Sequence, residues 1–284
     1  MADLAPIPIL SMATSGLNST RIRHFAASAA VWGVEFRMLG VGQKWGGFGW
    51  MAHQYAAEVA KLPPEQIAIV MDCTDAFVQA GEPDIRAAFT AAAAGKPIVL
   101  SLETGCPRTR CTEAPAAKGE VEAAEKKVGI SSLTHVNGGF VIGRAWALKR
   151  LWDYAANHSC CTNTRRNKWP SAQLGIGRFM LAHPELVAVD RTQQLIAVIN
   201  NMRSNEWRRH YELTNFTQPQ RDPAGKGLET WHRARNVHSR VAACFVHMPG
   251  IHEVYRKTYK TNIRIMVPFD TVDAALTPKR PVIA

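Results

Sequence analysis

The chain has 284 residues, of which 46% are hydrophobic and 20% are charged. This apolar fraction is enough to build a sizeable core and excludes an intrinsically disordered chain. No apolar run reaches the roughly 18 residues that a membrane-spanning helix requires. Lysine and arginine outnumber aspartate and glutamate by 34 to 23, a net charge of +11. That surplus predicts an anionic partner: a nucleic acid, an anionic surface or a phosphorylated small molecule.

The first twelve residues lack the pattern of a secretory signal peptide. They hold one acidic residue and no basic one, and their apolar run at residues 7–10 is short. We therefore expect a cytoplasmic protein whose first element is a β-strand. Six cysteines are too few for a disulfide scaffold, and reduced thiols are expected. A zinc site around Cys160 and Cys161 is the alternative.

Strands and helices alternate over the first 105 residues. Apolar, β-rich runs predict four strands, at residues 7–12, 34–39, 67–71 and 97–102. Apolar residues at helical spacing predict three helices, at residues 22–31, 50–62 and 84–94. Because such an alternation requires crossover connections, it predicts a mostly parallel sheet.

The rest of the chain is less regular. The segment 106–128 is rich in polar and charged residues and predicts a surface insertion or lid. Further strands are predicted at 136–144, 186–189, 195–199 and 242–246, and further helices at 145–156 and 171–182. Residues 201–240 show little periodicity, and the tail 271–284 shows no core pattern. Without a repeat or an obvious linker, a single domain over residues 1–270 is the simplest prediction.

Two carboxylates, Asp72 and Asp75, follow the predicted buried strand 67–71. In open α/β sheets, ligands bind at the carboxyl ends of the strands. Neighbouring acids repel each other unless a cation lies between them, so a hard divalent metal is one interpretation. The other is that Asp72 caps a turn and Asp75 is merely solvated.

A histidine, His247, directly follows the predicted strand 242–246. It can complete a metal shell, and Gly250 lets backbone amides approach a phosphate closely. By itself, a histidine in this position is more often structural. Combined with Asp72 and Asp75, it gives the ligand set expected for Mn²⁺ that holds a nucleotide diphosphate.

Short motifs, in order along most of the chain, resemble the glycosyltransferase domain of the procollagen lysyl hydroxylases, and more distantly other glycosyltransferase-A folds. Besides the segments around Asp72 and His247, the motifs are Ile9–Thr14, Leu39–Gly47, Ser101–Pro107, Val136–Gly143, Ala172–Leu174 and Val189–Asp190. The resemblance implies a glycosyltransferase-A-like α/β fold with a Rossmann-like, mostly parallel central sheet flanked by helices.

The resemblance also implies roles for individual residues. Asp72, Asp75 and His247 would bind Mn²⁺, which bridges the two phosphates of a UDP-sugar and acts as a Lewis acid on the leaving UDP. The residues that would lie beside the UDP-sugar are Thr14, Trp45, Thr74, Asn137, Gly138, Gly139 and Gly250.

The acidic residues of the family are missing at two positions. Ser171 and Ala172 stand just before the glutamine of a helix where the family has acids. Glu103, which matches a glutamate of the family, and Asp190 are therefore the candidates for the catalytic carboxylate.

A cation is missing as well. Met51 stands where the family has a lysine that faces the diphosphate. Lys44, Arg144 and Lys257 are the candidates to compensate for it.

These observations predict a Mn²⁺-dependent glycosyltransferase that transfers a hexose from UDP-glucose or UDP-galactose to an acceptor hydroxyl, with hydroxylysine-like groups among the candidate acceptors. Two alternatives stay open. One is a degenerate glycosyltransferase fold that binds a nucleotide sugar or a partner without turnover. The other is a basic nucleic-acid-binding protein that uses stretches such as Trp207–Tyr211, although no helix-turn-helix, zinc-finger or RNP signature supports it.

Overall fold

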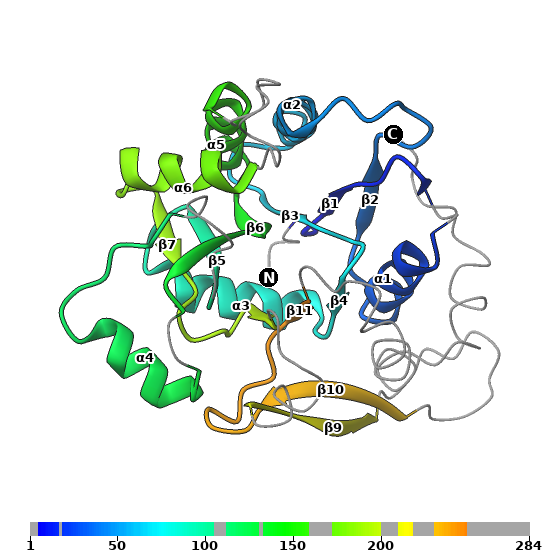
Figure 1. The fold of residues 1–284 in the computed structure, drawn as a ribbon. Coiled ribbons are helices and arrows are strands. Elements are labelled where there is room, and N and C mark those ends of the chain that lie inside the picture. Colours follow the sequence, from blue (N-terminus) through cyan, green and yellow to red (C-terminus); the bar gives the residue numbers. More distant parts are fainter. Residues whose placement is uncertain are drawn as a thin grey trace, which may run out of the picture.

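The computed structural model describes residues 5–16, 19–104, 112–130, 133–158, 172–199, 210–217 and 230–248. Within these residues the chain forms an α/β fold with a six-stranded sheet, a three-stranded sheet, a β-hairpin and six helices (Figure 1). The strands of the central sheet lie in the order β2-β1-β3-β6-β5-β7. The predicted α/β class with a mostly parallel sheet is therefore confirmed.

One strand of the central sheet is reversed. The six described strands are β1 (Ile9–Met12), β2 (Phe36–Leu39), β3 (Ile67–Met71), β5 (Ile98–Glu103), β6 (His135–Arg144) and β7 (Val187–Val189). β1 pairs in parallel with β2 and β3, and β5 with β7, whereas β6 pairs antiparallel with both β3 and β5. Consequently the start of β6 lies at the edge where the parallel strands end.

Helices cover both faces of this sheet (Figure 1). On one face lie α2 (Phe48–Val59), α5 (Ala145–His158) and α6 (Ala172–Ala182), and on the other lie α1 (Thr20–Val31) and α3 (Glu82–Ala93). Side chains along β3 alternate between the two cores: Ala68 and Val70 pack on the α5 side, and Ile69 and Met71 on the α1 side. Because both faces are covered, this strand is apolar throughout.

The predicted insertion contains a helix, α4 (Glu120–Val128). Its first turn carries Glu120 and Glu122 and its last turn carries Lys126 and Lys127, which matches the helix dipole. Ala124 and Val128 are buried, so the described part of this segment packs against the domain. No helix in the described ranges is long and apolar enough to span a membrane.

A second, smaller sheet contains β4 (Ala76–Val78), β11 (Phe245–His247) and β8 (Ile196–Val198), with β11 in the middle. β11 runs antiparallel to β4 and parallel to β8. β4 was not predicted, because three residues are too few to show a period. It directly follows Asp75, so this sheet connects the acidic segment to the late strand that carries His247.

Two strands lie between residues 201 and 240, where the sequence shows little periodicity and no strand was predicted. β9 (Tyr211–Thr217) and β10 (Thr230–Asn236) form an antiparallel hairpin. The buried Gln79 side chain anchors it: the Ala234 amide donates to Gln79 Oε1 at 2.7 Å, and Gln79 Nε2 donates to the Ala243 carbonyl at 3.1 Å. Both strands are polar in sequence, which conceals their period. The predicted tail 271–284 lies outside the described residues.

Candidate metal site

The pairing of β11 with β4 brings the predicted metal ligands together. Asp72 and Asp75 lie in the turn between β3 and β4, at the carboxyl edge of the central sheet. His247 ends β11, and the register of β11 with β4 places it opposite Ala76. The amide of Met248 then donates to the carbonyl of Asp75 at 2.8 Å. Asp75 and His247 are therefore neighbours in space although they are far apart in the sequence.

The three side chains converge on one point. His247 Nε2 lies 3.2 Å from Asp75 Oδ1 and 4.0 Å from Asp72 Oδ2. One ligand atom from each of the three residues lies within 4.8 Å of the other two. The His247 side chain is only 2% exposed and that of Asp75 19%, whereas that of Asp72 is 54% exposed. The cluster is thus closed on the histidine side and open to solvent on the Asp72 side.

Two of the converging atoms contact only each other at close range. Asp75 Oδ1 and His247 Nε2 are both buried and lie 3.2 Å apart, and among the described residues neither atom has a hydrogen bond to any other group. Burying such groups unsatisfied is costly, and each one requires a physical explanation. A divalent cation between them supplies that explanation. Two carboxylate oxygens and one imidazole nitrogen fit Mn²⁺, and three protein ligands leave positions for a substrate.

The charges of the cluster influence one another. Desolvation and repulsion by Asp75 raise the pKa of the Asp72 carboxyl to about 6, against the opposing effect of His247. Desolvation lowers the pKa of His247, but the carboxylates of Asp75, Asp72 and Glu103 outweigh it, so that pKa is raised overall. An added cation would offset the repulsion between the two acids, and it would take the place of the proton that these carboxylates favour on His247.

Behind the histidine lies a buried chain of polar side chains. Asn137, near the start of β6, has its Oδ1 3.1 Å from His247 Nδ1 and accepts a hydrogen bond from the Gly139 amide at 3.0 Å. Asn137 Nδ2 donates to Glu103 Oε2 at 3.2 Å. Gln173 Nε2 donates to the other oxygen of Glu103 at 2.7 Å. Glu103 is thus connected to the predicted metal ligand His247 through Asn137, and both of its carboxylate oxygens accept hydrogen bonds.

Gly138 and Gly139 make room for this arrangement. A Cβ on Gly139 would lie 2.1 Å from His247 Cε1, and one on Gly138 would lie 2.8 Å from the Cβ of Gln173. The Gly139 carbonyl also accepts a hydrogen bond from the Asp72 amide at 2.9 Å, and the Gly138 amide donates to Gln173 Oε1 at 3.0 Å. These glycines therefore have a packing role in the site, and their role beside a sugar stays a prediction.

The role of Gln173 could not be read from the sequence. The motif Ala172–Leu174 marked its segment, but only the tertiary contact between α6 and the start of β6 shows what its amide does. Ala172, one of the two positions at which the resemblance implies an acid, is buried at the beginning of α6. Ser171 and Gly250 lie outside the described residues.

Three predicted nucleotide-binding residues lie at the same edge of the sheet. Thr14 follows β1, and its carbonyl accepts a hydrogen bond from the Gly42 amide at 3.0 Å, which joins the loops after β1 and β2. Trp45, in the loop after β2, is 45% exposed and meets Phe48 edge-on. Thr74 is exposed between the two acids. Since β1, β2 and β3 are parallel, their ends lie at one edge.

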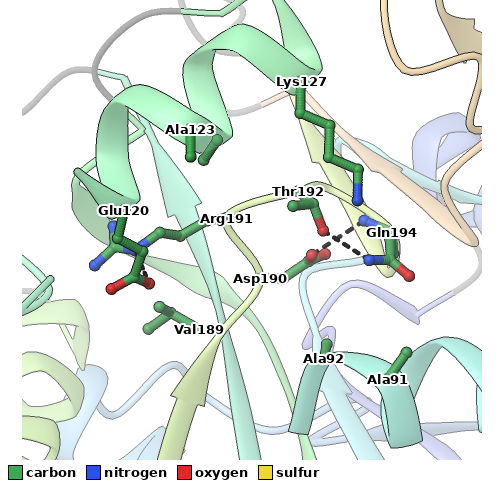
Figure 2. Close-up of a pocket in the computed structure, with 11 residues that line it drawn as sticks. Ala91, Ala92, Glu120, Ala123, Lys127, Val189, Asp190, Arg191, Thr192 and Gln194 are labelled. Carbon is green, nitrogen blue, oxygen red and sulfur yellow. Dashed lines mark hydrogen bonds and ion pairs between the residues drawn. The ribbon is translucent and has the colours of Figure 1, made fainter. Parts of the chain in front are cut away.

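Asp190, the second candidate for the catalytic carboxylate, is not joined to this cluster. It follows β7 and accepts hydrogen bonds from the amides of its own loop: Gln194 at 3.0 Å, Leu195 at 2.8 Å and Ile196 at 3.2 Å. It lines a pocket of about 380 Å³ between α3, α4 and the loop 189–194 (Figure 2). Burial raises its pKa even though these amides act in the opposite direction. The structure therefore gives Asp190 a role in shaping its loop.

The predicted compensation by Arg144 is wrong. Arg144 ends β6, and because β6 is antiparallel this end lies at the opposite edge of the sheet, where Arg144 pairs with Glu65 at 2.8 Å. Met51 is one of the buried residues of α2 and faces the core. Lys44 is exposed in the loop after β2, at the edge that carries the acids. Lys257 lies outside the described residues.

Known proteins do not identify this site. No protein-family model matches the chain, and no curated protein is significantly similar to it. The function must therefore be inferred from the chemistry of the cluster and from the ordered motifs.

Proposed function

We propose that this chain is a Mn²⁺-dependent glycosyltransferase of the glycosyltransferase-A type, which transfers a hexose from a UDP-sugar to an acceptor hydroxyl. The observation that carries the proposal is the convergence of Asp72, Asp75 and His247 at the carboxyl edge of an α/β sheet. Within the described part of the chain, the buried atoms Asp75 Oδ1 and His247 Nε2 have no hydrogen bond to any group outside this cluster. The ordered motifs support a nucleotide diphosphate as the group that completes the metal shell.

Different side chains would bind the metal and the uracil ring. Asp72, Asp75 and His247 would hold Mn²⁺, which supplies Lewis-acid stabilisation of the charge that develops on the leaving UDP. The exposed side of Asp72 leaves the solvent face of the cluster accessible to the diphosphate. Trp45 presents an exposed aromatic surface that suits the uracil ring. Transfer forms the bond between the acceptor oxygen and the anomeric carbon and breaks the bond from that carbon to the β-phosphate oxygen. It releases UDP, and the proton of the acceptor hydroxyl passes to solvent.

The test is UDP release with Mn²⁺ and either UDP-glucose or UDP-galactose, with and without hydroxylysine-containing peptides. Wild type is expected to release UDP and Asp75→Ala is expected to release none. In parallel, UDP plus Mn²⁺ at 100 times the Kd should stabilise wild type by about 2.7 kcal/mol, seen as a rise in melting temperature. The absence of a shift in wild type, or an equal shift in Asp75→Ala, contradicts the proposal.

A second candidate function is binding of the nucleotide sugar without turnover. It is favoured by the buried Ala172 in place of an acid and by the full engagement of both Glu103 oxygens. Slow release of free hexose from the donor in the absence of acceptor separates the two, since only an active enzyme hydrolyses its donor.

The nucleic-acid alternative is weakened because one aromatic residue of the stretch Trp207–Tyr211 is buried. Tyr211 is 2% exposed, so it offers no face on which a base can stack. Residues 207–209 of the same stretch lie outside the described part of the chain.

A further inference from the structure

We infer that Asn137 is a positioning residue, oriented by Glu103 and Gln173, that keeps the His247 proton on Nδ1 and directs the Nε2 lone pair at the metal. This inference rests on the metal site of the proposed function. It goes beyond that site by assigning a role to three residues that would not touch the ion.

The first step is the orientation of the Asn137 amide. The Gly139 amide is a donor only, so the Asn137 atom that lies 3.0 Å from it is the oxygen. The Glu103 carboxylate is an acceptor only, so the atom that faces it at 3.2 Å is the nitrogen. The two contacts independently give the same orientation, and the side chain cannot be flipped without losing both.

The second step is the position of the imidazole proton. Asn137 Oδ1, which has no proton, lies 3.1 Å from His247 Nδ1. This contact is a hydrogen bond only when Nδ1 carries the proton. In a neutral imidazole the other nitrogen then has the free lone pair. That nitrogen, Nε2, is the one that lies 3.2 Å from Asp75 Oδ1 and 4.0 Å from Asp72 Oδ2.

The third step is what holds Glu103. Gln173 Oε1 accepts the Gly138 amide at 3.0 Å, so the Gln173 nitrogen is the atom that donates to Glu103 Oε1 at 2.7 Å. Glu103 therefore accepts one amide donor on each oxygen. The backbone amides of Gly138 and Gly139 therefore determine which way the side-chain amides of Gln173 and Asn137 are oriented.

Because these side chains are buried, losing one of their hydrogen bonds is costly. Asn137, Glu103 and His247 are 3%, 4% and 2% exposed, so water cannot easily replace a lost partner. Partners of this kind orient a metal-binding histidine and typically change metal affinity by 10–100-fold when they are removed.

The structure offers an isosteric test with its own rescue. In Glu103→Gln the new side chain has one acceptor and one donor where two acceptors are needed, so either Asn137 or Gln173 loses its partner. The rescue is the double exchange, Glu103→Gln with Gln173→Glu. In this double variant the carboxylate is at position 173, where it accepts hydrogen bonds from the Gly138 amide and from the side-chain nitrogen at position 103. The side-chain oxygen at position 103 then accepts the hydrogen bond from Asn137, as in wild type. Asn137→Leu removes the acceptor at Nδ1 without changing the net charge.

The measurement is the Mn²⁺ dissociation constant of the full chain, obtained from the electron paramagnetic resonance signal of free Mn²⁺. Circular dichroism melting of each metal-free variant verifies that it folds. Glu113→Gln is the control, because it removes one charge from an exposed residue close to His135 at the start of β6 without touching the buried chain of side chains.

We expect the Kd to rise about 10–100-fold in Glu103→Gln and in Asn137→Leu. The double exchange should return it close to the wild-type value, and the control should not change it. Wild-type affinity in folded Glu103→Gln and Asn137→Leu would overturn the inference and leave the proposed function intact. An equal loss in Glu103→Gln and in the folded double exchange would also overturn it. If wild type binds no Mn²⁺, the proposed function and the inference fail together.

Discussion

Asp75 and Asp190 both follow strands that end at the same edge of the central sheet, but their carboxylates are in opposite situations. Asp190 accepts three backbone hydrogen bonds from its own loop, which the fold alone explains. Asp75 Oδ1 is buried and lies 3.2 Å from an imidazole nitrogen, and among the described residues neither atom has another hydrogen-bond partner. A residue type at a strand end is thus a weak indicator of function, and the unsatisfied group is the stronger one.

The largest expected effect is on ligand binding at Asp75. Asp75→Ala should abolish the Mn²⁺-dependent stabilisation, about 2.7 kcal/mol at 100 times the wild-type Kd. In the metal-free protein it should lower the free energy of unfolding by no more than about 1 kcal/mol, because the lost attraction to His247 is offset by removal of a buried carboxylate that repels Asp72. Urea unfolding with and without Mn²⁺ measures both values. If Asp75→Ala were still stabilised by Mn²⁺, Asp75 would not be a metal ligand and would not differ from Asp190 in this respect.

The second largest effect is expected at Asp190, where substitution should reduce stability and leave Mn²⁺ binding unchanged. Asp190→Ala leaves three amides without their acceptor, in a loop that leads into buried residues, and should lower the free energy of unfolding by about 3 to 5 kcal/mol. Chemical denaturation of the metal-free protein measures this loss. The Mn²⁺ Kd of the folded fraction should stay at its wild-type value. A stable Asp190→Ala protein that has lost Mn²⁺ binding would show that Asp190 belongs to the site.

A smaller effect is expected at Gly139. In Gly139→Ala the new methyl group would lie 2.1 Å from the His247 ring, which must move. We expect a loss of about 1 to 3 kcal/mol in stability, as for other overpacked positions, and a weaker Mn²⁺ affinity. Gly81→Ala is the matched control, because the nearest atom to its Cβ would lie at an ordinary 3.6 Å. Thermal melting and Mn²⁺ titration of both variants should differ, and equal behaviour would exclude close packing at Gly139.

The smallest effect is expected at the opposite edge of the sheet. Arg144 and Glu65 form an exposed ion pair, with side chains 44% and 70% exposed. Arg144→Ala should therefore cost less than about 1 kcal/mol and leave UDP release unchanged. A large loss of UDP release in this variant would show that the reversed end of β6 takes part in donor binding.

The sequence was most informative where a single pattern determines the structure. The apolar runs predicted the central strands, and the acids after 67–71 and the histidine after 242–246 were correctly placed at strand ends. The three-residue β4 and the polar hairpin β9–β10 were missed because neither has a visible hydrophobic period. The position of Arg144 depended on the direction of β6, which pairing decides and periodicity does not.

The connections within the site could not be predicted from the chain. Glu103, Asn137 and Gln173 come from β5, β6 and α6, and their hydrogen bonds exist only after the sheet and α6 have packed. The same holds for the contact between Gly139 and His247. A motif marks such residues as a set, and only their geometry shows which of them hold the others in place.

The most direct test of the central claim is calorimetric titration of Mn²⁺ into the wild-type chain and into Asp75→Ala, each with UDP present. After subtraction of a protein-free blank that contains UDP, we predict one Mn²⁺ site per chain in wild type and none in Asp75→Ala, with both proteins folded. Absence of binding in wild type, or the same Kd in both proteins, would contradict a metal site built from Asp72, Asp75 and His247.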